Sequence, residues 1–132
     1  MSFLDVNEAS LALLSSTTVS LAADAATTIY TVPAGKRCVL AFAILIAGAD
    51  AGTSDIQIGQ NGATTDFCGP SDLANVNAQY DACILQPMPV ATPGSVVLTK
   101  SYAAATVIEA EVTNNAGGAT NTLLLYGTLY DA

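Results

Sequence analysis

The sequence contains no histidine and no tryptophan, and only three of its 132 residues are lysine or arginine. Histidine is the commonest general base at neutral pH and orients the nucleophile in catalytic triads. The G-x-S-x-G nucleophile motif, the H-E-x-x-H zinc motif and the glycine loops that bind nucleotides are absent as well. The sequence therefore predicts a protein that is not an enzyme.

Positive charge is scarce, because Lys36, Arg37 and Lys100 stand against eleven carboxylates and the net charge is −8. A protein that binds nucleic acid must neutralise several phosphates with Lys and Arg. Attraction to an anionic membrane surface needs the same residues. We therefore predict no nucleic acid and no membrane as partners. The acidity either keeps copies of the protein soluble or matches a more basic partner protein.

Long apolar runs are also missing. The most apolar stretch, residues 38–49, is shorter than the roughly 20 residues of a membrane-spanning helix. Asp5 and Glu8 lie where a signal peptide carries basic residues. Residues 38–49 are therefore expected to form a buried strand.

The three cysteines, Cys38, Cys68 and Cys83, have no C-x-x-C spacing, so a zinc or redox site lacks its usual ligands. Cys38 lies in an apolar run and is expected to be a small core residue. Cys68 and Cys83 either pair in a disulfide or stay reduced, and the reduced state fits folding in a cytoplasm.

The carboxylates form no recognisable site. Asp50, Asp55 and Asp66 lie in or beside glycine-rich turns, where calcium ligands gather, but the D-x-D-x-D-G pattern is absent. Glu109 and Glu111 share one face of an expected strand, as a glycosidase pair would, but this spacing is typical of solvated charges. We predict no cofactor and no metal.

Small β-formers, Thr, Ser, Gly and Asn are abundant, whereas the residues that favour long helices are few. We predict one all-β domain, a jelly-roll-like β-sandwich of about eight strands over residues 17–132. Residues 1–16 form an N-terminal arm or a first strand. Strands are expected over residues 17–22, 27–32, 36–47, 55–58, 80–85, 95–99, 106–113 and 122–130.

The segments between these strands carry turn signals. The Val32-Pro-Ala-Gly35 sequence has the residue preferences of a type I turn, and Asn61-Gly62 predicts a hairpin. Residues 63–79 are polar and irregular, and residues 69–72 could begin a single helical turn. The prolines at 87, 89 and 93 keep that segment out of a central strand.

Two expected strands are apolar on both faces. In residues 36–47, Val39, Ala41, Ala43 and Leu45 form one face and Leu40, Phe42, Ile44 and Ile46 the other. In residues 122–130, Leu123, Leu125 and Leu129 oppose Leu124, Tyr126 and Tyr130. One sandwich core covers only one face of a strand, so the other needs a second layer or another subunit.

Apolar residues near the N-terminus also lack a local partner. We therefore predict an interface with another subunit or a partner protein that includes Phe3, Leu4, Val6, Tyr126 and Tyr130.

Residues 28–40 (TIYTVPAGKRCVL) resemble a segment found in many small phage virion proteins, in which an aromatic residue and a TVPAGK turn precede an apolar strand. The ending LYGTLY over residues 125–130 is similar to the closing strand of those proteins. The resemblance covers about a third of the chain and implies a β-sandwich component of the virion.

The resemblance implies a capsid decoration (cement) protein, folded in the host cytoplasm and located on the capsid surface. Its expected partners are the major capsid protein and copies of itself, as a homotrimer. The alternative is a tail-associated protein or a receptor- or glycan-binding module, although no repeat shaft of a tail fibre is present.

Overall fold

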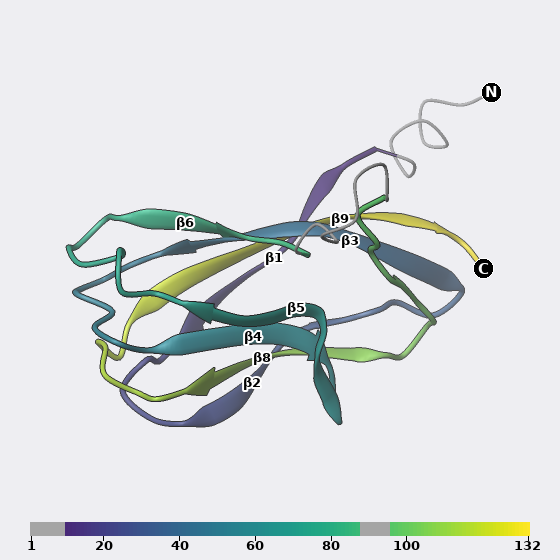
Figure 1. Ribbon diagram of the computed structural model, residues 1–132. Coiled ribbons are helices and arrows are strands. Elements are labelled where there is room, and N and C mark those ends of the chain that lie inside the picture. Colours follow the sequence, from purple (N-terminus) through teal and green to yellow (C-terminus); the bar gives the residue numbers. More distant parts are fainter. Residues whose placement is uncertain (1–9, 88–95) are drawn as a thin grey trace.

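The computed structural model describes residues 10–87 and 96–132, and they form two antiparallel β-sheets packed face to face (Figure 1). Sheet A is the upper layer of Figure 1, and it contains β1 (Ala12–Val19), β9 (Asn121–Asp131), β3 (Lys36–Ile46) and β6 (Ala82–Leu85), with β7 (Ser101–Tyr102) also pairing with β3. Sheet B is the lower layer, and it contains β2 (Ala25–Thr31), β8 (Val107–Thr113), β4 (Asp55–Gln60) and β5 (Ala63–Asp72). The prediction of an all-β sandwich of about eight strands is confirmed.

The strand pairs are nested along the chain. β1 pairs with β9, β2 with β8, β3 with β6 and β4 with β5. The chain thus follows one long antiparallel ribbon that alternates between the two sheets. This nesting supports the predicted jelly-roll winding.

The hydrophobic core fills the space between the sheets and takes the inward side chains of both. Its largest fully buried members include Leu21, Leu40, Leu45, Ile56, Ile58, Leu73, Ile108, Leu123 and Leu125. In β8 the predicted inward residues Ile108, Ala110 and Val112 are all buried. The period-two pattern of this strand therefore located its core face correctly.

The N-terminal predictions fall partly outside the described residues. β1 begins at Ala12 and ends at Val19, so the predicted division between residues 16 and 17 falls within a strand. The predicted interface residues Phe3, Leu4 and Val6 lie outside the described residues.

Two predicted segments are wrong. Residues 63–72 form strand β5 rather than an irregular segment, and no helical turn begins at residue 69. β5 pairs only with β4, so it is an edge strand, which tolerates Pro70. Residues 96–99 lie outside any strand, and Val96, Val97 and Leu98 are exposed there.

The turn before β3 also differs from its prediction by one residue. Lys36 N donates a 3.3 Å hydrogen bond to the carbonyl of Pro33, so the turn covers Pro33–Lys36. Gly35 is its third residue and has φ of +74°, as a type II turn requires. The Asn61-Gly62 hairpin is confirmed, since Gln60 pairs with Ala63 across it.

Candidate docking surface

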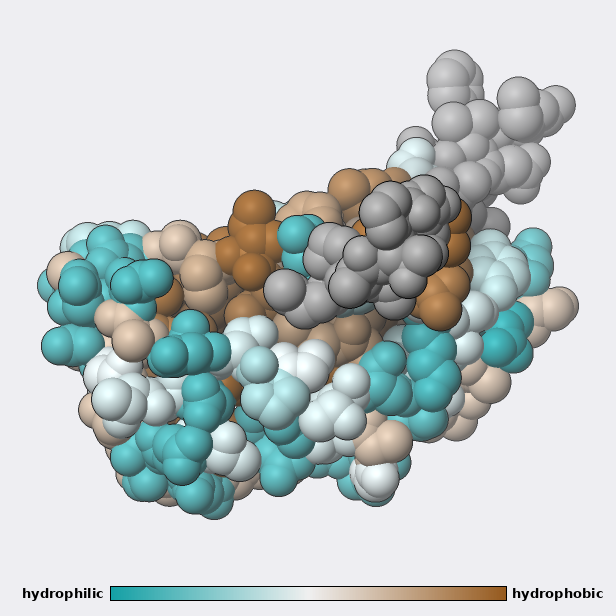
Figure 2. Space-filling view, in the orientation of Figure 1, coloured by the Kyte–Doolittle hydropathy of each residue, from teal (hydrophilic) through white to brown (hydrophobic). Residues whose placement is uncertain are grey.

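The outer face of sheet A is apolar. Its cross-strand rows follow from the register, in which Leu13 pairs with Tyr126 and Tyr126 with Phe42, while Leu124 pairs with Ile44 and Ile44 with Ile84. Leu13 and Ile84 are 51% and 63% exposed. Figure 2 shows brown, hydrophobic atoms over the sheet A side of the molecule. We call this the apolar face: Leu13, Phe42, Ile44, Ile46, Ile84, Leu124 and Tyr126.

A β-bulge at Ala41 decides which side chains of β3 reach this face. Leu40 pairs with Gly127 and Phe42 with Tyr126, so Ala41 is the extra residue. Cys38 and Leu40 therefore point inward before the bulge, whereas the buried Ala43 and Leu45 point inward after it. The predicted grouping of Val39 and Ala41 with Ala43 and Leu45 is wrong, because the bulge exchanges the two faces.

Gly127 makes this bulge possible. A Cβ atom there would lie 2.6 Å from the carbonyl oxygen of Val39 and 2.9 Å from Cδ1 of Leu14. A second bulge between Leu13 and Ser15 lies on the other side of Gly127, in β1. A single glycine inside a strand pattern is a known signal for a bulge or a close backbone approach, so the sequence contained this information.

The two predicted tyrosines have different surroundings. Tyr126 stacks on Phe42, with ring centroids 4.9 Å apart and 21° between the planes, near the middle of the apolar face. Tyr130 is 39% exposed at the edge of the sheet, where its hydroxyl is 2.6 Å from Oγ of Ser101. Nε of Arg37 donates a 3.1 Å hydrogen bond to the same Oγ.

The outer face of sheet B is polar and acidic. Nε2 of Gln57 donates hydrogen bonds to Thr64 and to Glu111, and the hydroxyl of Thr64 also donates to Glu111. Asn61 donates to Glu109 in the same way. These carboxylates are held by neighbouring side chains of their own sheet, so the two outer faces of the sandwich differ sharply in polarity.

A partly buried hydrogen-bond cluster joins the sheets at one end. Oδ2 of Asp66 lies 2.6 Å from Nζ of Lys100, and its Oδ1 accepts hydrogen bonds from Tyr102 and from the N–H of Gln60. Burial by itself raises the pKa of Asp66, but these hydrogen bonds and the Lys100 charge outweigh burial and hold that pKa below its usual value. Burial, followed by the hydrogen bond to Asp66, raises the pKa of Tyr102.

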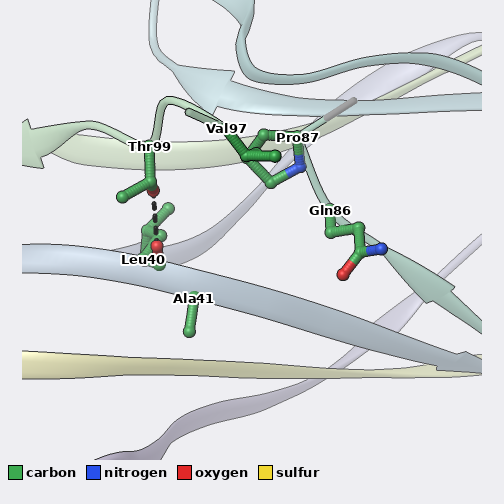
Figure 3. A pocket seen from close by; sticks show the side chains of 6 residues that line it. All are labelled: Leu40, Ala41, Gln86, Pro87, Val97 and Thr99. Atoms are coloured by element: carbon green, nitrogen blue, oxygen red, sulfur yellow. Dashed lines mark hydrogen bonds between the residues drawn. The ribbon is translucent and has the colours of Figure 1, made fainter. Parts of the chain in front are cut away.

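A small pocket of about 300 Å³ lies beside the bulge (Figure 3). β3 pairs with β7 at Cys38 and Val39 and with β6 from Ala43 onward. In the gap between them, the carbonyl of Leu40 accepts a 2.6 Å hydrogen bond from Oγ1 of Thr99. The pocket is lined by Leu40, Ala41, Gln86, Pro87, Val97 and Thr99.

In the part of the chain that the structure describes, no three His, Cys, Asp or Glu side chains lie close enough together to hold a metal ion. Asp50 accepts a hydrogen bond from the N–H of Gly52, and Asp55 accepts one from Asn114. Within residues 10–87 and 96–132 there is also no helix that could cross a membrane.

All three cysteines are free thiols. The disulfide between Cys68 and Cys83 that the sequence left open is therefore not formed. Burial raises the pKa of Cys38 to about 11, so this thiol stays protonated at neutral pH.

The structure thus defines a two-sheet β-sandwich with one apolar and one polar outer face. No family model and no curated protein matches the sequence. Among solved structures, a chain of the cyanophage Pam1 capsid asymmetric unit shares the fold with a TM-score of 0.55 and 17% sequence identity. The match covers 89% of this chain and 84% of that chain.

Proposed function

We propose that this chain is a non-enzymatic structural protein of a phage particle, namely a capsid decoration (cement) protein that binds the major capsid protein. The observation that carries the proposal is the apolar face of sheet A, which suits the chain to assembly with other protein chains. A contiguous apolar surface of this kind typically marks a protein contact. The fold shared with a capsid chain of a cyanophage favours a particle protein over other assembly proteins.

The physical basis of such a role is passive burial of surface. Apolar area removed from water contributes roughly 25 cal/mol per Å², and a standard interface buries about 800 Å² on each partner. Association costs consume much of this gain. Attachment at many equivalent sites of a particle, or by more than one chain at a time, then provides avidity.

The carboxylates support a role without catalysis. Glu109 and Glu111 are the two acidic residues that share a strand face, and both are engaged by amide or hydroxyl donors of their own sheet. They point out from sheet B, where the neighbouring side chains hold them in place. This arrangement favours a structural polar surface over an acid–base pair.

The test is binding to phage heads that lack this protein. Purified chain is mixed with heads assembled from the major capsid protein of the same phage, and bound protein is measured by co-sedimentation. We expect saturable binding and a higher melting temperature of the heads. Absence of binding at protein concentrations well above those of head subunits would contradict the proposal.

A truncated chain tests the predicted arm. Removing residues 1–9 leaves β1 intact, since β1 begins at Ala12, so the sandwich should fold as before. We expect weaker binding to heads, with the full-length chain as the control. Full retention of binding would locate the capsid contact on residues 10–132 instead.

Glycan binding is the second candidate, and Tyr130 is the observation that favours it. An exposed tyrosine beside the Arg37 and Ser101 side chains offers a ring face and hydrogen-bond donors together. Saturable binding to a glycan array that disappears in Tyr130→Ala, together with no binding to heads, would support this function and exclude the first.

A further inference from the structure

The charges of this protein are segregated along its strands. All three cations lie at the end of the sandwich where β3 begins: Lys36 and Arg37 are in β3, and Lys100 precedes β7. Lys36 pairs with Asp131 at 2.7 Å and Lys100 with Asp66 at 2.6 Å. With Glu109, whose carboxylate accepts a hydrogen bond from Asn61 in the hairpin at the same end, this end holds three positive and three negative side chains among its described residues.

The opposite end is purely acidic. It is formed by the loops that follow β1, β3, β5 and β8, which hydrogen bonds connect, including Leu21 N to Gly118 O and Ala51 N to Val76 O. Since the sequence holds no further Lys or Arg, no lysine or arginine side chain lies there. The carboxylates at this end are Asp24, Asp50, Asp55, Asp72 and Asp81.

Among the residues that the structure describes, Arg37 is the cation without a carboxylate partner. Lys36 and Lys100 each form a salt bridge, whereas Arg37 donates to the hydroxyl and the carbonyl of Ser101, at 3.1 and 3.2 Å. These two bonds fix the guanidinium group at the rim of sheet A, in the cross-strand pair with Tyr130. Arg37 is therefore positioned to meet a carboxylate from outside the chain.

The apolar face lies between these ends and contains no carboxylate, so a second copy can pack against it without burying any of the −8 net charge. Two flat sheet faces pack fully against each other about 10 Å apart. Three sheets around a three-fold axis leave part of each flat face uncovered. A pair of copies is the arrangement that covers this face.

The charge segregation selects the orientation of the pair. A two-fold axis along the strands would place the five carboxylates of one acidic end beside the five of the other copy. A two-fold axis that lies between the faces and runs perpendicular to the strands makes the strands of the two copies run in opposite directions. Each acidic end then lies beside Arg37 of the other copy. Coulomb attraction between opposite ends favours this second axis.

We infer that the apolar face of sheet A is the contact between two copies of this chain, packed with their strands antiparallel. In this arrangement the midpoint between Arg37 and Ile46 falls at the Ala41 bulge and Phe42, so the stacked pair of Phe42 and Tyr126 lies at the two-fold axis. Aromatic residues at the centre of an interface are typical binding hot spots. The inference deepens the proposed assembly function, on which its role in a particle rests: the apolar face joins two copies, and the capsid contact is left to the remaining surface of the pair.

The first experiment measures the mass of the purified chain by light scattering and sedimentation. We expect twice the monomer mass of 13.3 kDa. A monomer at high concentration would overturn the inference, and so would the trimer that the sequence resemblance implies. Head binding is measured separately, so a monomer that binds heads contradicts only the pairing, and a dimer that does not bind heads contradicts only the proposed function.

Two matched lysine variants test the face. Ile84→Lys places a charge at a position that is 63% exposed in the single chain, so the fold should remain. We expect it to raise the dimer dissociation constant roughly tenfold or more. Thr28→Lys adds the same charge at an exposed position of sheet B and should leave the dimer unchanged. Equal effects of the two variants, or none from Ile84→Lys, would overturn the inference.

Two variants of Arg37 test the orientation. In the antiparallel pair, Arg37→Gln should weaken dimerisation and Arg37→Glu should weaken it further, because the second variant faces carboxylates. With like ends together, removal of this charge would leave the dimer as strong or stronger. A dimer that is as strong or stronger in Arg37→Gln would overturn the antiparallel packing. The control for a folding defect is the melting temperature of each Arg37 variant combined with Ile84→Lys, which makes the chain monomeric; this temperature should equal that of Ile84→Lys alone.

Discussion

The hydroxyl group of Tyr102 in β7 donates a 2.7 Å hydrogen bond to Oδ1 of Asp66 in β5, which ties sheet A to sheet B. Tyr102 is only 2% exposed. Lys100 completes the link, since its Nζ lies 2.6 Å from the same carboxylate and 5.7 Å from the Tyr102 ring centroid. Lys100 and Tyr102 thereby fix the chain segment before β8 to sheet B.

Asp66→Asn should lower the free energy of unfolding at pH 7 by about 1–3 kcal/mol, because hydrogen bonds to a charged group are lost. The folded-state pKa of Asp66 lies below its usual value of 3.8. The ionised carboxylate therefore stabilises the fold above about pH 4, and this contribution is lost as the pH falls through the lower folded pKa. Urea unfolding at pH 7 and in strong acid checks this.

The control for that experiment is Asp131→Asn. The side chain of Asp131 is 79% exposed and its salt bridge to Lys36 lies on the surface, so the expected loss is under about 1 kcal/mol. A difference between Asp66→Asn and the natural protein that persisted undiminished in strong acid would refute the role of the carboxylate.

Tyr130 should ionise at a lower pH than an ordinary tyrosine side chain. The hydrogen bond with Ser101 and the neighbouring Arg37 charge lower the pKa of Tyr130, although partial burial opposes them. Burial and Asp66 raise the pKa of Tyr102, so its phenol should stay protonated until the protein unfolds. Alkaline titration of tyrosinate absorbance should lose the step below the ordinary tyrosine pKa in Tyr130→Phe and keep that step in Tyr126→Phe.

Gly127→Ala should destabilise the fold by about 1–3 kcal/mol, as overpacking of a tight site does. The new methyl group would meet the carbonyl oxygen of Val39 at 2.6 Å, and backbone cannot move as freely as a side chain end. Gly69→Ala is the matched control, since nothing lies within 4 Å of its added Cβ. Equal chemical denaturation midpoints for the two variants would disprove the close approach at the bulge.

Asn121→Ala should cost about 2–4 kcal/mol, because it leaves buried backbone groups without partners. Asn121 is 1% exposed, and its Nδ2 donates to the carbonyls of Val19 and Gly118, while its Oδ1 accepts from the N–H of Gly48. Thermal unfolding should show a clear decrease in melting temperature. Asn75→Ala, at an exposed position, should change it little.

The alternation of inward and outward residues predicted the strands and their core faces correctly where one face is polar or where the strand has no bulge. β8 shows this, because Glu109 and Glu111 mark its outer face, and β9 shows it through its unbroken alternation. In β3 the pattern failed, since apolar side chains on both faces do not show where a one-residue insertion lies, and the signal for the bulge, Gly127, is in the partner strand β9. β5 was missed for a different reason: it is a polar edge strand, so its sequence lacks the hydrophobic alternation that indicates a strand.

The candidate surface was predictable only in outline. Tyr126 lies within the apolar face, as its strand pattern indicated, and Tyr130 lies at the edge. Leu13 and Ile84 belong to the same surface because of cross-strand register, which pairs residues far apart in sequence. Register between distant strands is not written in local periodicity, so these residues could not be selected from the sequence.

The segregation of charge between the two ends gives a single copy an electric dipole along its strands, whereas in the antiparallel pair the two dipoles oppose each other. A dipole experiences a torque in an external field, so a copy that diffuses toward a charged surface is turned before any atoms touch. Beside a positively charged surface the loops after β1, β3, β5 and β8 would face that surface, and beside a negative one the start of β3 would. Approach is thereby oriented by long-range forces, while the apolar face acts only at contact.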